Sequence, residues 1–196
     1  MENEILDYLS EFITLNEEER NALLQCISIK TFPKGSILIR EGDLATHSYF
    51  VIEGCIRQYY IEDGIEKTTH FYTENQSTPS YFVKEKKTTA QHFLACTEKT
   101  KAAVCNAPDE MAFFKDNPRL ESLSRMLTEQ DFVDSQEAFA KFVKSTPEER
   151  YKDLLKNRPD LINRVPQYQL ASYLGIKPES LSRIRKRLAK SVNTEI

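Results

Sequence analysis

The sequence has no long apolar run and no leader-like start. Among 196 residues, no stretch approaches the roughly 20 consecutive apolar residues that a membrane-spanning helix needs. The first residues, Met-Glu-Asn-Glu-Ile-Leu-Asp, lack the basic and then apolar segments of an export signal. The sequence therefore predicts a soluble protein that stays in the cytoplasm.

Cysteine and histidine are scarce and scattered, with four cysteines and three histidines in the whole chain. No Cys-x-x-Cys pair is present, and no histidine lies at zinc-ligand spacing from a cysteine. Thiolates this far apart do not predict an iron–sulfur cluster or a haem site, so we expect free, buried thiols and no cofactor. Since no Ser/His/Asp or Cys/His constellation appears either, an enzyme is not predicted. The residues concerned are Cys26, Cys55, Cys96, Cys105, His47, His70 and His92.

Positive charge is concentrated at the C-terminal end, although the net charge of the chain is −3. From residue 145 onward there are 11 Lys/Arg and 6 Asp/Glu, whereas the preceding 144 residues hold 16 and 24. A basic C-terminal module on an acidic body is typical of a segregated nucleic-acid site.

The segment from Val165 to Lys190 has the pattern of a helix-turn-helix. Two short amphipathic stretches meet at Gly175, which suits a turn residue with positive φ, and Pro178 suits the first turn of the second helix. The apolar positions recur at spacings of three and four. They are Leu170, Ala171 and Leu174 in the first stretch, and Leu181, Ile184 and Leu188 in the second.

The other side of the second stretch is basic and polar. Ser180, Arg183 and Arg187 share it, with Lys186 and Lys190 beside them. A helix that is apolar inward and basic outward, and that follows a tight turn, is suited to the DNA major groove. The alternative is a solvated helical hairpin whose basic face only maintains solubility.

Upstream of this module the pattern changes from helical to β-rich. Residues 1–27 look helical, with Asn16 as an N-cap before three glutamates. Short runs of branched and aromatic residues then predict strands, and Asp63-Gly64 predicts a two-residue hairpin turn. Many short strands with regular glycine-containing turns favour an antiparallel roll. The candidate strands are Ile37–Ile39, Tyr49–Ile52, Ile56–Ile61 and Ile65–Tyr72, closed by His92–Cys96 and Lys101–Cys105.

After a short helix that begins at Pro108, the longest helical stretch runs from Pro118 to Lys144. A helix of this length spans about 40 Å, so it must pack along the roll or pair with a copy of itself. We favour pairing. The apolar positions expected at the dimer contact are Leu120, Leu123, Met126, Leu127 and Val133.

A sharp boundary follows at Ser145–Glu149. Thr146 can cap a helix, Pro147 suits its first position, and Glu149 completes a capping box. We therefore expect a sensor domain with cap helices at residues 1–116, a dimerisation helix at 117–144 and a DNA-binding domain at 145–196.

With these motifs in this order, the whole chain resembles the Crp/Fnr family of bacterial transcription regulators. The resemblance is carried by Phe50–Tyr60 with Asp63-Gly64, and above all by Leu170–Arg185. It implies an α+β fold with a cyclic-nucleotide-binding-like roll, a long dimerisation helix and a helix-turn-helix domain. Because only six residues follow Lys190, little or no β wing is expected.

The resemblance also implies a homodimer that places one recognition helix on each half of a palindromic duplex. The base-reading positions of the family correspond to Glu179 and Arg183, which lie on one helix face, and Ser180 joins them. Contacts with phosphates are expected from Gln167, Lys177 and Arg187. RNA polymerase and an unidentified small-molecule effector are further candidate partners.

One departure from the family concerns the effector. The cyclic-AMP-binding branch has a Gly-Glu pair and then an Arg-Ser/Thr-Ala run, but residues 79–90 lack the pair and have Thr88 in place of the arginine. A bound phosphate would lose its bidentate partner, which lysine does not replace. We therefore predict a regulator that cyclic AMP does not control. Lys84, Lys86 and Lys87 fit a solvated loop better than an anion site.

The resulting hypothesis is a dimeric, sequence-specific transcription regulator. An alternative is a small-ligand sensor module whose helix-turn-helix contacts protein instead of DNA.

Overall fold

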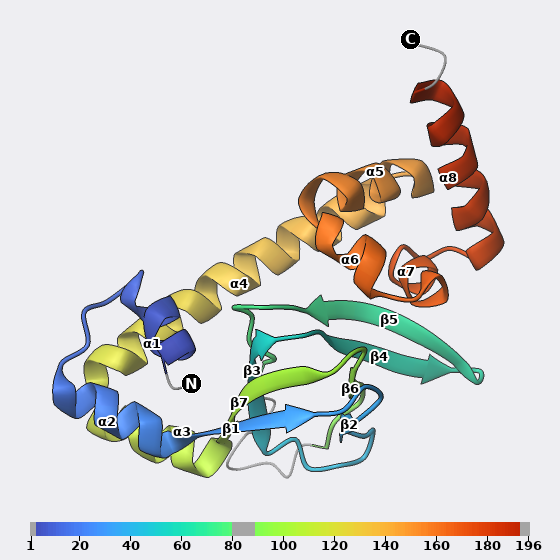
Figure 1. The fold of residues 1–196 in the computed structure, drawn as a ribbon. Helices are drawn as coiled ribbons and strands as arrows, with labels where there is room; N and C mark the ends of the chain where they lie inside the picture. Colours follow the sequence, from blue (N-terminus) through green and yellow to red (C-terminus); the bar gives the residue numbers. More distant parts are fainter. Residues whose placement is uncertain (1–2, 80–88, 193–196) are drawn as a thin grey trace. The chain divides into compact units, whose positions relative to one another are not determined.

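A computed structural model describes residues 3–79 and 89–192 of the chain (Figure 1). Helices dominate its two ends, and seven strands lie between them. The N-terminal helices are α1 (Asn3–Ser10) and α2 (Glu17–Cys26). The strands are β1 (Ile27–Phe32), β2 (Ile37–Ile39), β3 (His47–Glu53), β4 (Ile56–Glu62), β5 (Ile65–Tyr72), β6 (Phe93–Cys96) and β7 (Thr100–Asn106). The later helices are α3 (Ala107–Asp116), α4 (Pro118–Lys144), α5 (Pro147–Asn157), α6 (Pro159–Arg164), α7 (Gln167–Tyr173) and α8 (Pro178–Val192).

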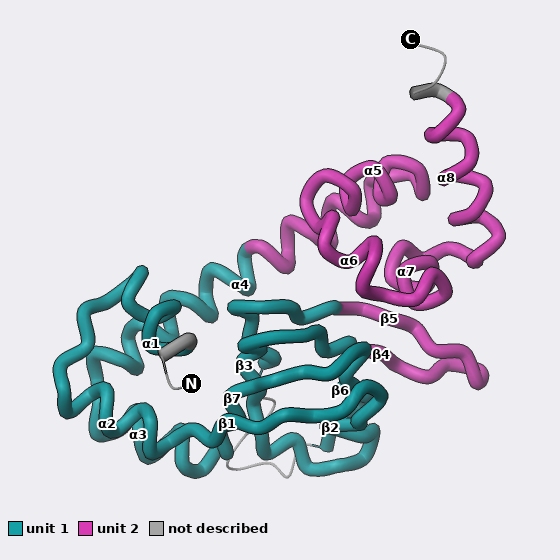
Figure 2. The backbone as a smooth tube through the Cα atoms, viewed as in Figure 1, with its two compact units in different colours: residues 1–58, 71–133 teal, residues 59–70, 134–196 magenta. Residues whose placement is uncertain are grey.

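The contacts within the chain divide it into two compact units (Figure 2). Unit 1 comprises residues 1–58 and 71–133, and unit 2 comprises residues 59–70 and 134–196. Helix α4 contributes its first part to unit 1 and its last part to unit 2. The three-part division expected from the sequence stays a prediction.

The β-roll consists of two antiparallel sheets. Strands β1, β7 and β3 form one sheet in that order, and β2, β6, β4 and β5 form the other. Branched and aromatic side chains fill the space enclosed by them, where Val51, Ile56 and Leu94 are fully buried. This confirms the predicted α+β fold with an antiparallel roll. Strand β1 was not among the predicted strands, although it lies where the sequence becomes β-rich.

A two-residue turn at Gly54 joins β3 to β4. Gly54 has φ +107°, and its N–H donates to Glu74 Oε1 over 2.8 Å. A Cβ atom at this position would lie 2.7 Å from Lys99 O and 2.7 Å from Thr100 Cα. The turn is therefore packed directly against the backbone of the β6–β7 connection, where only glycine fits.

The hairpin between β4 and β5 turns at Asp63-Gly64, as the sequence predicted. Both residues have positive φ, +52° and +74°, which is the type I′ geometry favoured by two-residue hairpins. In contrast to Gly54, a Cβ at Gly64 would meet nothing within 4 Å. Within unit 2, the hairpin contacts α7: Ser172 Oγ accepts the Thr68 N–H over 2.9 Å and donates to Glu66 O over 2.9 Å.

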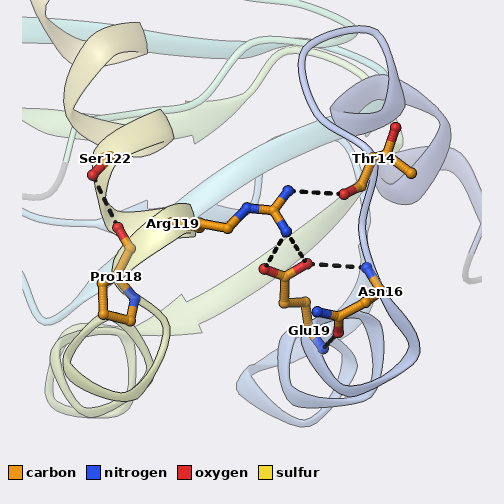
Figure 3. Close-up of polar contacts among 6 residues, drawn as sticks. All are labelled: Thr14, Asn16, Glu19, Pro118, Arg119 and Ser122. Atoms are coloured by element: carbon orange, nitrogen blue, oxygen red, sulfur yellow. Dashed lines mark hydrogen bonds and ion pairs between the residues drawn. The ribbon is translucent and has the colours of Figure 1, made fainter.

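A predicted helix cap anchors the start of α4 within unit 1 (Figure 3). Asn16 and Glu19 form a capping box at α2, in which each side chain accepts from the other residue's N–H. The same Glu19 carboxylate binds the Arg119 guanidinium over 3.1 Å. Arg119 also donates to Thr14 O over 3.0 Å, so α4 begins tied to the loop before α2.

The four cysteines carry free thiols, of which three are buried and Cys26 is half-buried. The Cys26 and Cys105 sulfurs lie 3.0 Å apart, and burial raises the pKa of both thiols. Within residues 3–79 and 89–192, no group of three His, Cys, Asp or Glu side chains could hold a metal ion. None of the helices in these ranges is both long and apolar enough to cross a membrane.

Candidate nucleic-acid interface

The C-terminal module begins with a second capping box. The Thr146 side chain accepts the Glu149 N–H over 3.3 Å, while Glu149 Oε2 accepts the Thr146 N–H over 2.8 Å. Pro147 occupies the first turn of α5. All three roles match those predicted from the sequence. The short helix α6 was not predicted, and Pro159 lies in its first turn, where proline is tolerated.

Helices α7 and α8 are joined by a tight turn centred on Gly175, which has φ +67°. The Gly175 N–H donates to Ser172 O and the Ile176 N–H to Ala171 O, each over 3.0 Å. These two bonds form a Schellman motif, which satisfies carbonyls left open at the end of α7. The predicted need for glycine at this turn is therefore confirmed.

The apolar residues of both helices form the core of the module. Leu170, Ala171 and Leu174 from α7 are buried with Leu181 and Ile184 from α8, and Leu188 is partly buried. Because these positions hold one face of α8 inward, its remaining faces are oriented outward. This is the helix-turn-helix arrangement expected from the spacing of the residues.

The outward face of α8 carries the residues predicted to read bases. Glu179 and Arg183 are exposed one helical turn apart, and Ser180 is half-buried between them. Arg183 Nη2 donates to Ser180 Oγ over 3.3 Å. The structure thus brings these three side chains together near the start of α8, where a recognition helix contacts base edges.

The three predicted phosphate-binding residues are exposed too, and two of them have partners within the module. Gln167 accepts from Arg185, and Arg187 pairs with Glu148. A hydrogen bond from Lys152, at 2.9 Å, lowers the pKa of Glu148, and the Arg187 pair lowers it further. Arg187 must therefore exchange a carboxylate for a phosphate if it contacts DNA.

The sequence did not reveal the role of Arg150 on α5. Its Nε donates to Leu174 O over 2.9 Å, and its Nη1 donates to Ser145 O over 2.7 Å and to Phe142 O over 3.3 Å. The guanidinium also lies 4.4 Å from the centre of the Phe142 ring. An arginine on an amphipathic helix is ordinarily solvated, so only the folded backbone shows what it binds.

The predicted dimer residues differ in their exposure along α4. Leu120 and Leu123 are buried within the chain, at 5% and 8% exposed, whereas Met126 and Val133 are 52% and 48% exposed. Leu127 is intermediate. Leu120 and Leu123 thus have little apolar area left for a second copy. Further along α4, large exposed apolar side chains that were not predicted include Phe132, Phe139 and Val143.

Residues 80–88, which include Thr88, Lys84, Lys86 and Lys87, lie outside the described part of the chain. The predicted absence of an arginine anchor for cyclic AMP therefore rests on the sequence.

Comparisons with known proteins agree with this geometry. Residues 29–97 match the family described as cyclic nucleotide-binding domain. A search of curated proteins found no match.

Similar solved structures cover almost the whole chain. They include CLP, a c-di-GMP-responsive global regulator of Xanthomonas campestris, with 18% identity, a TM-score of 0.70 and coverage of 90% of this chain and 93% of that chain. FixK2 from Bradyrhizobium japonicum has 15% identity and a TM-score of 0.70, and the match covers 84% of this chain and 85% of that chain. A transcriptional regulator of the Crp/Fnr family from Eubacterium rectale has 17% identity and a TM-score of 0.70. The match covers 94% of this chain and 88% of that chain.

The match to the roll and the likeness of the whole chain complement each other. A chain with a domain of the cyclic nucleotide-binding type at residues 29–97, followed by a long helix and a helix-turn-helix, has the fold of the Crp/Fnr transcription regulators.

Proposed function

We propose that this protein is a dimeric, sequence-specific DNA-binding transcription regulator. The observation that carries the proposal is the outward face of α8, where Glu179 and Arg183 are exposed one turn apart after a glycine turn. An arginine in this position can donate two hydrogen bonds to guanine O6 and N7, and a glutamate can accept from a cytosine amino group. The basic charge of residues 145–196 supplies the attraction to phosphates.

The exposed apolar side chains of α4 support the dimeric part of the proposal. Phe132 and Phe139 lie seven residues apart, as do Met126 and Val133, and all four are exposed. Apolar residues repeated every seven positions are typical of helices that pair. A two-fold dimer predicts a palindromic site with half-sites about one helical turn apart. Selection of bound duplexes from a random pool tests this directly.

We also propose that cyclic AMP is not the effector. The chain lacks the Gly-Glu pair and has Thr88 where the family's phosphate-binding arginine stands. The match of residues 29–97 concerns the domain type and leaves the ligand open. A thermal-shift titration is expected to show no change with cyclic AMP; a rise in melting temperature that saturates would contradict this.

Replacing Arg183 with alanine tests base reading. Loss of a bidentate contact to guanine should cost about 1–3 kcal/mol on the selected site and relax the preference at one base pair per half-site. Binding to a panel of single-base variants of the site measures this. Lys186→Ala removes an equal charge from the same helix and is the matched control, with a uniform loss across the panel. A uniform loss for Arg183→Ala would make it a phosphate contact instead.

Replacing Glu148 with glutamine should strengthen DNA binding. The change removes the carboxylate that holds Arg187 within the module, so the guanidinium no longer has to leave an ion pair before it meets a phosphate. Because exposed ion pairs are weak, the expected gain is only a few-fold and should shrink as salt is added. Fluorescence anisotropy at several salt concentrations measures it.

Glu121→Gln, on the part of α4 in unit 1, makes the same charge change away from Arg187. If it strengthens binding equally, net charge accounts for the gain and Arg187 does not take part.

A further inference from the structure

One side chain satisfies the C-terminal carbonyls of two helices in unit 2. Arg150 binds Phe142 O and Ser145 O at the end of α4 and Leu174 O at the end of α7. The last carbonyls of a helix have no partner within it and carry the negative end of its dipole. A guanidinium is suited to both needs because it is always charged and offers five donors in a fixed fork.

The aromatic ring of Phe142 completes the arrangement. It lies under the Arg150 guanidinium, whose Cζ is 4.4 Å from the ring centre. On the side of the turn, a Cβ built at Gly175 would lie 2.9 Å from Phe142 Cζ and 3.8 Å from Arg150 Nη2. The glycine before the recognition helix therefore leaves the space that these two side chains occupy. The Arg150 side chain and the Phe142 ring therefore connect the end of α4 to the turn before α8.

We propose that Arg150 is a positioning residue, which fixes the direction of the recognition helix relative to the end of α4. The proposal rests on the DNA-binding function proposed above. If two copies pair through α4, the direction of each α8 from the end of α4 determines the distance between the two reading helices. Arg150 then determines which half-site spacing the dimer accepts, although it contacts no base itself.

Two variants separate the geometry of the guanidinium from its charge. Arg150→Met keeps much of the apolar stem and removes all three hydrogen bonds. Arg150→Lys keeps the charge, but a single ammonium cannot reach the carbonyls of both helices as a planar fork does. Both variants should therefore behave alike if the fork is what matters.

The experiment compares three kinds of duplex for the full-length protein: a single half-site, the selected palindrome, and palindromes with one or two base pairs added or removed between half-sites. For both variants we expect half-site affinity within about twofold of wild type. Affinity for the palindrome should fall on the order of 10-fold, because α8 no longer has one fixed direction relative to the end of α4. For the same reason, the affinities for palindromes of different spacing should differ less than they do in wild type.

Each other outcome has a definite meaning. If the variants retain the spacing preference of wild type, Arg150 does not position the reading helix. Should half-site and palindrome binding fall by the same factor, Arg150 only keeps the module folded and the proposal is overturned. Failure of wild type to bind any duplex would instead contradict the DNA-binding function, which is thus tested apart from the role of Arg150.

Discussion

Gly54→Ala is expected to destabilise the protein by about 2–6 kcal/mol. Two penalties add at this position. A non-glycine residue at φ +107° is strained, at a cost of about 1–3 kcal/mol, and forcing an atom into packed structure costs about 1–3 kcal/mol more. The added Cβ would meet Lys99 O and Thr100 Cα at 2.7 Å, and backbone cannot rotate away as a side chain can. Chemical denaturation monitored by circular dichroism measures the loss.

Gly64→Ala is the matched control for this prediction. Gly64 also has positive φ, +74°, but a Cβ there meets nothing within 4 Å, so only the conformational cost remains. For an alanine in the left-handed region that cost is about 1–2 kcal/mol. The difference between the two variants isolates the close approach of the Gly54 turn to the β6–β7 connection. Equal losses of stability in the two variants would show that Gly54 is not packed closely against the β6–β7 connection.

Phe139→Glu is expected to abolish the dimer and lower the affinity for a palindromic site by about 100-fold or more. Phe139 is 66% exposed on α4, so its replacement removes little packing within one chain. In a paired helix it would place a charge in an apolar contact, opposite the same charge from the second copy. Loss of pairing removes the gain in affinity from two linked contacts, which is on the order of 10²–10⁴. Analytical ultracentrifugation and anisotropy measure both effects.

Ala138→Glu adds the same charge one position earlier, about 100° around the helix from Phe139. A dimer that pairs through Phe132 and Phe139 should stay intact, since alanine and glutamate both favour helix and residue 138 is turned away from these two side chains. Loss of the dimer with Ala138→Glu would instead place the contact on the face of Leu127, eleven residues earlier. A dimer that survives Phe139→Glu would show that pairing uses another face of the chain. That result would favour the other possibility considered from the sequence, in which α4 packs along the roll instead of pairing with a second copy.

Local signals in the sequence were reliable where a few neighbouring residues determine the geometry. The capping box of Thr146 and Glu149 and the hairpin turn at Asp63-Gly64 depend only on residues within three positions of each other, and both were predicted. The same holds for Gly175, whose positive φ follows from a helix that must end and turn. Most of the roll and the face of α8 could therefore be predicted.

Features that depend on distant segments could not be predicted. Leu120 and Leu123 are buried within the chain, which their spacing of three along the helix does not encode. Arg150 binds carbonyls as far away as Leu174 O, and backbone groups carry no sequence signal. The sulfurs of Cys26 and Cys105 meet only because β1 pairs with β7 over a separation of 79 residues.

The contact of Ser172 with the hairpin also bears on how the molecule avoids aggregation. In the part of the chain that the structure describes, strand β5 is the last strand of its sheet and pairs with a strand on one side only. Such an edge offers unpaired N–H and C=O groups to any extended segment of another chain. The Ser172 hydroxyl occupies the Thr68 N–H and the Glu66 carbonyl together, as a neighbouring strand would. Within unit 2, the Ser172 hydroxyl of α7 thus covers part of the edge of β5 and hinders pairing with another chain there.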